Sequence, residues 1–313
     1  MNTELTKQMA INTPIMLAPM GSVAGGELAA AVSNAGGLGM IGVGYGDTDW
    51  LDEQLSIVSR KTNKPWGVGF ITWCLTKEIL LQVLSYKPHA LMFSFGDISP
   101  WLEEIVKHDV AVFSQIHDLA GALEAHRLGV DFIVAQGTEA GGHGTGQRTT
   151  LSLVRGIKKQ PIDTPVIAAG GIADSRAVAA ALKLGAEGVS VGTRFYASFE
   201  ALAHYRMKER LVECGGDDTI RTQVFDIIRG INWPKGYNAR AITNKFVARW
   251  HGDEQRLRSS ITKHQPAFYL AQENADPKVA MVWAGESIDS IFNIEEAGKL
   301  LEQMHRETLR HMR

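Results

Sequence analysis

Eight short apolar runs alternate with helix-like segments along the first two thirds of the chain, and this alternation limits the possible folds. Several runs are continuously apolar, as expected for parallel strands covered on both faces. The runs are Ile15–Ala18, Leu38–Ile41, Trp66–Phe70, Ala90–Ser94, Val110–Gln115, Phe132–Gln136, Val166–Ala168 and Gly188–Val191. The helix-like segments are Gly26–Asn34, Trp50–Arg60, Thr76–Ser85, Pro100–Lys107, Asp118–Arg127, Ser152–Lys159 and Ser175–Leu184. This order predicts an α/β fold, a TIM (β/α)8 barrel.

A doubly wound open sheet is the alternative fold, and the first βα unit disfavours it. The glycines of Gly21–Gly26 lack the G-x-G-x-x-G spacing that opens a dinucleotide-binding unit. The regular alternation stops near Tyr196. We therefore predict a barrel made of residues 1–199 plus 284–313, and a helical insertion at 200–283, between strand 8 and the last helix, that covers the active-site face. Ile294–Arg310 would be that last helix.

Composition excludes several classes of function. The 313 residues exceed the roughly 250 of a typical barrel, which leaves room for the insertion. The net charge of −2 provides no attraction for nucleic acid or for an acidic membrane surface. Two cysteines, Cys74 and Cys214, cannot form a disulfide framework. With no signal-peptide pattern and no apolar run long enough to span a bilayer, we expect a cytoplasmic protein with no nucleic-acid or membrane partner.

Two glycine clusters follow the last two predicted strands. Gly170-Gly171 comes after strand 7, and Gly192-Thr193 comes after strand 8. Backbone N–H groups at strand-to-helix turns bind phosphate, and barrel enzymes often place a phosphate site there. Either cluster alone is explained by tight packing of a strand on a helix. Two in succession favour a phosphate site.

A third glycine-rich stretch contains a histidine. His143 lies in the segment Thr138–Gly146, directly after a buried strand, beside Gly141 and Gly142. Alone, such a stretch is more often a turn with an incidental surface histidine. With the phosphate clusters downstream, it indicates a backbone cradle under a flat ligand and an acid/base group beside it. We predict His143 as the catalytic residue, with His117 as second choice.

Other candidates lie where the predicted strands end, which is where barrel enzymes build their sites. Gln115 and Gln136 end neighbouring strands, and an amide both donates and accepts hydrogen bonds. This suits a planar heterocycle such as a flavin, although either amide alone could equally satisfy buried backbone. No H-x-x-x-H or C-x-x-C pattern indicates a metal site.

At these positions the chain resembles a known family. Pro14–Met20, Ala29–Gly39, the His143 segment, Val166–Asp174 and Val191–Phe195 are similar to nitronate monooxygenases, formerly called 2-nitropropane dioxygenases. Flavin-dependent enoyl-ACP reductases and NADH:quinone reductases share these motifs. Two positions depart from relatives: Gly69 stands where many have asparagine, and Gln115 where some have lysine.

The resemblance implies an FMN enzyme that oxidises alkyl nitronates, or nitroalkanes, to a carbonyl compound and nitrite with O2. It implies a small-molecule substrate and a monomer or homodimer. The alternatives are an FMN-dependent NAD(P)H reductase, of the quinone or enoyl-ACP type, and a flavin-free phosphate-binding lyase or isomerase. The implied cofactor-binding residues are Ala18, Pro19, Met20, Gly69, Ser94, Gln115, Gln136, Gly141, Gly142, Gly170, Gly171, Gly192 and Thr193.

Overall fold

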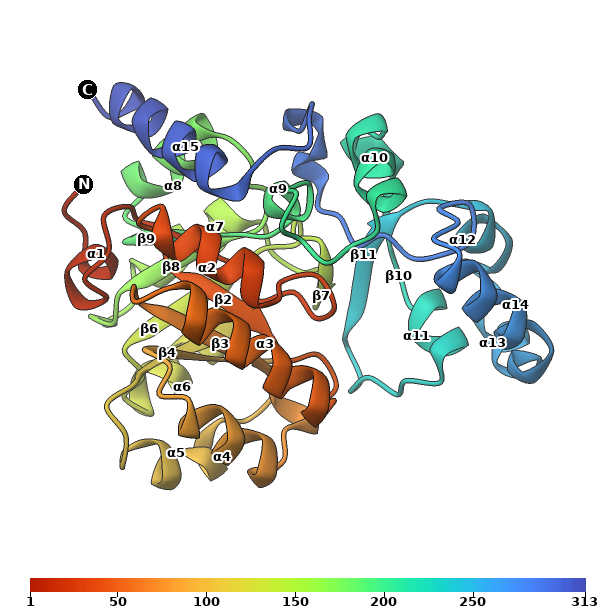
Figure 1. The fold of residues 1–313 in the computed structure, drawn as a ribbon, viewed down its shortest axis with the longest axis horizontal. Helices are drawn as coiled ribbons and strands as arrows, with labels where there is room; N and C mark the ends of the chain where they lie inside the picture. Colours follow the sequence, from red (N-terminus) through yellow and green to blue (C-terminus); the bar gives the residue numbers. More distant parts are fainter.

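Eight parallel strands form the barrel in the computed structural model, which describes all 313 residues (Figure 1). Neighbouring strands pair in the order β1-β9-β8-β6-β5-β4-β3-β2. The cylinder closes where Leu17 N–H donates to the Leu38 carbonyl, at 2.9 Å. The predicted barrel is therefore confirmed. Its strands are β1 (Ile15–Leu17), β2 (Gly39–Gly42), β3 (Trp66–Ile71), β4 (Ala90–Ser94), β5 (Ala111–Ile116), β6 (Phe132–Gln136), β8 (Val166–Ala169) and β9 (Gly188–Val191).

Helices alternate with these strands and pack outside them. Asp118 accepts a hydrogen bond from a backbone N–H in the first turn of α6 (Leu119–Arg127), and Asp174 does so for α8 (Ser175–Lys183), so each caps its helix. The last helix, α15 (Ala297–His311), packs between α8 and α2 and completes the ring. The other helices of the ring are α2 (Gly26–Asn34), α3 (Thr48–Lys61), α4 (Lys77–Ser85), α5 (Ser99–Ile105), α6 (Leu119–Arg127), α7 (Thr150–Ile157) and α8 (Ser175–Lys183).

The segment between β9 and α15 is not wholly helical, which corrects the sequence prediction. It contains two antiparallel strands, β10 (Thr219–Thr222) and β11 (Asn238–Ile242). β11 also pairs with β7 (Gly142–Gly144), a strand of the barrel's own β6–α7 connection. These strands carry arginine, asparagine and threonine, so apolar periodicity did not mark them. The helices of the segment are α10 (Tyr205–Glu213), α11 (Val224–Arg229), α12 (Lys245–Trp250), α13 (Glu254–Arg258) and α14 (Ile261–Glu273).

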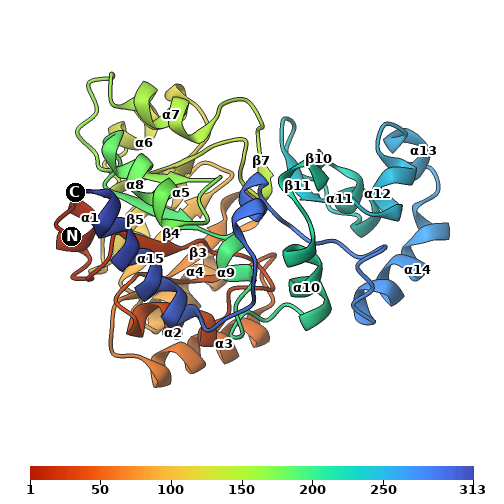
Figure 2. The ribbon, with the colours of Figure 1, turned by 90° about the horizontal axis from the view of Figure 1, so that it is seen from above.

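This segment has its own core and lies to one side of the barrel (Figure 2). Nine buried residues form that core, all between Val224 and Phe268, separate from the 75-residue core of the barrel. Apolar side chains of α11 to α14 thus support β10 and β11 from behind. None of the protein's helices combines the length and the apolar character needed to cross a membrane.

Candidate active site

Most of the predicted site residues lie at the carboxyl ends of the barrel strands, whereas Gly69 lies within β3 and Gly141, Gly142 and His143 lie in the β6–α7 connection. Ala18, Pro19 and Met20 follow β1, and Gly192 follows β9 beside them. A Cβ built on Gly192 would lie 3.4 Å from the Ala18 Cβ and 3.5 Å from the Met20 sulfur. The two strand ends thus meet with little space between them. Ser94 ends β4, is buried, and makes no hydrogen bond through its hydroxyl.

The loop after β8 has the geometry of an anion cradle. Gly170 and Gly171 have φ values of +101° and +71°, which favour glycine. Neither their N–H groups nor that of Gly192 donate to any protein acceptor. A Cβ on Gly170 would lie 2.9 Å from the Ala140 Cβ, so this loop also lies against the His143 segment. Three unpartnered N–H groups beside the short helix α9 (Thr193–Tyr196) fit a phosphate group.

The two predicted amides meet, and they are joined by the second-choice histidine. Gln115 Nε2 donates to Gln136 Oε1 at 3.2 Å, and His117 Nε2 lies 2.7 Å from the same oxygen. Burial lowers the pKa of His117, which favours the neutral imidazole as donor to the amide. The amides therefore form one polar edge at the ends of β5 and β6.

The sequence suggested that His143 lies in an open loop, but the residue lies in strand β7. Its backbone is held by β11, in register with Ala239. Its Nε2 lies 3.0 and 2.9 Å from the two carboxylate oxygens of Asp226, on α11. Trp233 stacks on the imidazole, with ring centroids 3.6 Å apart and planes 10° apart. Partners from the inserted segment thus fix the orientation of the imidazole.

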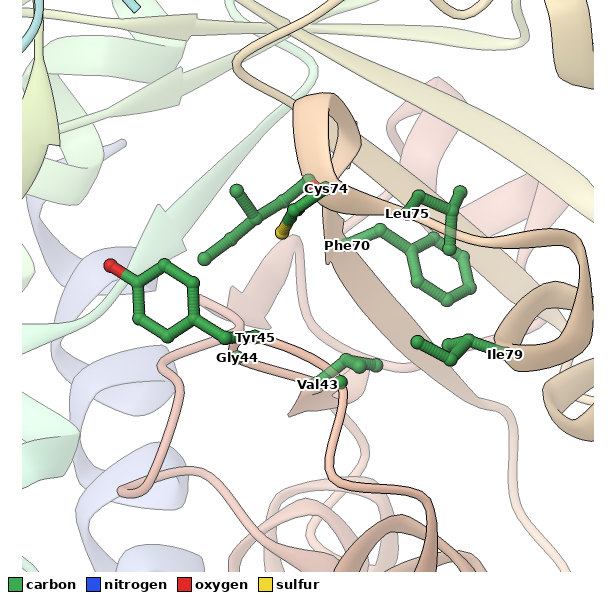
Figure 3. Close-up of a pocket in the computed structure, with 9 residues that line it drawn as sticks. Val43, Gly44, Tyr45, Phe70, Cys74, Leu75 and Ile79 are labelled. Carbon is green, nitrogen blue, oxygen red and sulfur yellow. Dashed lines mark hydrogen bonds between the residues drawn. The ribbon is translucent and has the colours of Figure 1, made fainter. Parts of the chain in front are cut away.

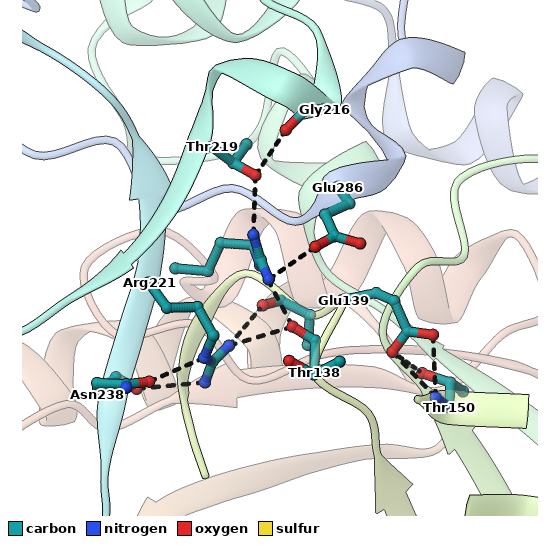
Figure 4. Close-up of polar contacts among 10 residues, drawn as sticks. Thr138, Glu139, Thr150, Gly216, Thr219, Arg221, Asn238 and Glu286 are labelled. Carbon is teal, nitrogen blue, oxygen red and sulfur yellow. Dashed lines mark hydrogen bonds and ion pairs between the residues drawn. The ribbon is translucent and has the colours of Figure 1, made fainter. Parts of the chain in front are cut away.

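Two arginines, Arg240 buried and Arg221 partly buried, hold the chain segment that precedes His143 (Figure 4). Arg221 and Arg240 face each other across β10 and β11 and both donate to the Thr138 carbonyl. Arg240 also pairs with Glu286 at 2.7 Å, whereas Arg221 has no carboxylate partner. The pKa of Arg221 is lowered to about 10, mainly by burial and to a smaller extent by repulsion from Arg240. Arg221 thus carries a positive charge beside the His143 segment that no carboxylate pairs with.

Aromatic side chains from the barrel and the inserted segment contact one another. This aromatic cluster comprises Tyr45, Trp73, Phe95, Trp233 and Tyr237. Phe95 directly follows β4 with φ of +64°, a strained conformation for a bulky residue and one often found at functional sites. Figure 3 shows an apolar hollow behind Tyr45, lined also by Val43, Phe70 and Ile79. No predicted site residue lines that hollow.

Sequence reasoning missed Asp226, Trp233, Arg221 and Arg240. All four lie in the part of the chain that was predicted only as an insertion. The sequence Trp-Pro-Lys-Gly at 233–236 is typical of a turn, but nothing local indicates that the indole of Trp233 reaches His143, 90 residues earlier. The Asp226 contact spans 83 residues.

A family model described as nitronate monooxygenase matches residues 2–73 and 72–307. The chain is 30% identical to a probable nitronate monooxygenase of Staphylococcus haemolyticus strain JCSC1435, with 91% of each chain covered. It is 29% identical to one of Staphylococcus aureus strain JH9, over 90% of this chain and 91% of the relative.

Two solved structures are also similar. FabK from Thermotoga maritima superposes with a TM-score of 0.85 at 30% identity, over 99% of this chain and 97% of FabK. Nitroalkane oxidase from Streptomyces ansochromogenes superposes with a TM-score of 0.84 over 98% of each chain. Because the two sequences are only 24% identical, this superposition shows a shared fold alone.

Proposed function

Because this chain belongs to the nitronate monooxygenase family, we propose that it uses FMN and O2 to convert alkyl nitronates to carbonyl compounds and nitrite. Family membership makes it an oxidoreductase. The observation that carries the finer proposal is the position of His143. It lies in a segment that contacts the proposed phosphate cradle of Gly170 and Gly171.

The residues at the strand ends fit the shape and polarity of FMN. The N–H groups of Gly170, Gly171 and Gly192 would bind its phosphate, with Thr193 beside them. The amides of Gln115 and Gln136 would face a polar edge of the ring, and Ala18, Pro19 and Met20 would lie along it. Gly69, Ser94, Gly141 and Gly142 complete this proposed set. When bound, FMN supplies the redox chemistry that passes electrons from the nitronate to O2.

The protein's own part in the reaction is to bind and orient the substrate. His143 would bind the nitro or nitronate group, either taking a proton from the α-carbon of a nitroalkane or holding the nitronate anion as an imidazolium. The charge of Arg221, which no carboxylate pairs with, favours an anion nearby. The aromatic cluster would give the bound substrate an apolar wall on this side.

Anaerobic mixing tests the proposal. Purified, FMN-loaded protein is mixed without oxygen with propane-2-nitronate and, separately, with NADH or NADPH. Nitronate should bleach the flavin absorbance, and admitted O2 should restore it with release of nitrite. His143→Asn should keep its flavin and lose about 10²–10⁴-fold in turnover. Near-normal turnover by this variant would remove His143 from the mechanism and make His117 the next candidate.

The same experiment decides the second candidate, an FMN-dependent NAD(P)H reductase. The 30% identity with Thermotoga maritima FabK over nearly the whole chain favours testing it. Fast bleaching by NADH or NADPH, with no response to nitronate, would establish the reductase and refute the oxygenase. A purified protein that binds no flavin would refute both.

A further inference from the structure

Asp226 is a buried acid whose carboxylate has one hydrogen-bonding partner, His143. Its side chain is 5% exposed, and that of His143 is 10% exposed. Both carboxylate oxygens lie within 3.0 Å of Nε2, and no other group donates to them. An ionised carboxylate only accepts hydrogen bonds, so Nε2 must carry a proton. The contact therefore determines which nitrogen of the imidazole is protonated in the neutral ring.

The other ring nitrogen is left free. Nδ1 of His143 has no hydrogen-bonding partner in the protein, and it is not among the fully buried polar atoms that lack one. With Trp233 stacked on one face of the ring, the imidazole cannot turn over without breaking both the stack and the ion pair. Nδ1 is thus the one nitrogen that can reach a ligand.

We propose that Asp226 is a positioning residue that keeps the proton on Nε2 and presents Nδ1 of His143 to the substrate. Because its carboxylate accepts the hydrogen bond from the Nε2 N–H, it also stabilises the positive charge that the ring gains when Nδ1 takes up or carries a proton. The assignment of Nδ1 to the reaction rests on the proposed function. The assignment of the Nε2 proton rests on the contact alone.

A purely structural role explains the contact less well. The ladder between β7 and β11 already ties the His143 segment to the inserted segment, and two arginines reinforce it. A buried carboxylate adds little stability to this pairing, because the cost of removing its charge from water offsets much of its attraction to the imidazole. Its placement on the imidazole of the candidate catalytic residue is better explained by a function for the charge.

Nitrogen NMR of the FMN-loaded protein tests this directly. The imidazole nitrogens are labelled with ¹⁵N, and His143→Asn identifies the His143 signals among those of the ten histidines. In the unaltered protein Nε2 should be protonated. In Asp226→Asn the Nδ1-protonated form should appear, because an amide can donate to a bare Nε2. Asp226→Glu, which keeps a carboxylate, should retain protonated Nε2. Trp233→Phe is the matched control, since it changes the stack and leaves the hydrogen bond.

Turnover gives the second measurement. Asp226→Asn should lower kcat for nitronate by about 10²–10⁴-fold, with a much smaller change in KM and unchanged flavin content. A bare Nε2 in the unaltered protein would overturn the proposal, whether or not the variants fold. So would a folded Asp226→Asn variant with unchanged nitrogen shifts and kcat. If nitronate is not a substrate, the proposed function fails, and the nitrogen shifts still decide the role of Asp226.

Discussion

Gly69 is where one added methyl group should disturb the candidate site most directly. A Cβ at this position would lie 2.3 Å from both Cβ and Cγ of Pro19. Ordinary carbon contacts are about 3.5–4.0 Å, so the two segments must separate by more than about 1 Å. The proline ring is closed onto the backbone, so the relief must come from the backbone of residues 18–20. Gly69→Ala should therefore cost about 1–3 kcal/mol of stability, as overpacking does.

The displaced segment is the one proposed to lie along FMN, so affinity should fall with stability. If about 1.4 kcal/mol of the cost falls on the bound form, the Kd for FMN rises about tenfold. Thermal unfolding with and without FMN, and a fluorescence titration with FMN, measure the two effects. Gly298→Ala is the matched control, because its methyl would lie 3.7 Å from the Ala35 Cβ in a helix. A Gly69→Ala variant with unaltered Tm and Kd would refute the packing argument.

Two further changes test the cradle and the buried histidine. Gly171→Asp should place a carboxylate among the unpartnered N–H groups and abolish FMN binding; normal flavin content in a folded variant would contradict the proposed phosphate site. Burial lowers the pKa of His117 in the folded protein. Its contribution to the free energy of unfolding is therefore complete above the pKa of the unfolded chain, about 6.5, and is lost as pH falls towards the folded pKa. His117→Gln should therefore lose less stability between pH 7 and pH 5 than the unaltered protein, as measured by urea unfolding; equal losses would show that His117 does not contribute.

The barrel was predictable because each of its strands is buried on both faces. Ala90–Ser94, Phe132–Gln136 and Gly188–Val191 were predicted with the bounds the structure has, and each is buried or nearly so along its length. In such strands the apolar run and the strand coincide, so a local pattern suffices. Because Gln115 and Gln136 end neighbouring strands, the predicted strands alone are enough to place the two amides side by side.

The partners of His143 could not be predicted in this way, because their positions depend on long-range pairing. β11 has the sequence Asn-Ala-Arg-Ala-Ile, in which Arg240 is buried although it is charged. Its burial depends on Glu286 and on the Thr138 carbonyl, which lies 102 residues earlier in the chain. Asp226 lies in a short helix whose apolar neighbours pack into the second core. Neither residue belongs to a local motif that would distinguish it from a surface charge.

The second core supports the strand pairing that holds His143 in place. β7, which carries His143, belongs to the barrel's β6–α7 connection in sequence but pairs only with β11 in space. Without the inserted segment, that strand would lose its backbone partners, the arginines that hold Thr138, and the carboxylate on Nε2. The barrel alone would still present the N–H groups of Gly170, Gly171 and Gly192, since β8 and β9 position them. On our proposal, the barrel therefore binds the cofactor and the inserted segment orients the group that meets the substrate, so changes in residues 200–283 should alter reactivity more than FMN affinity.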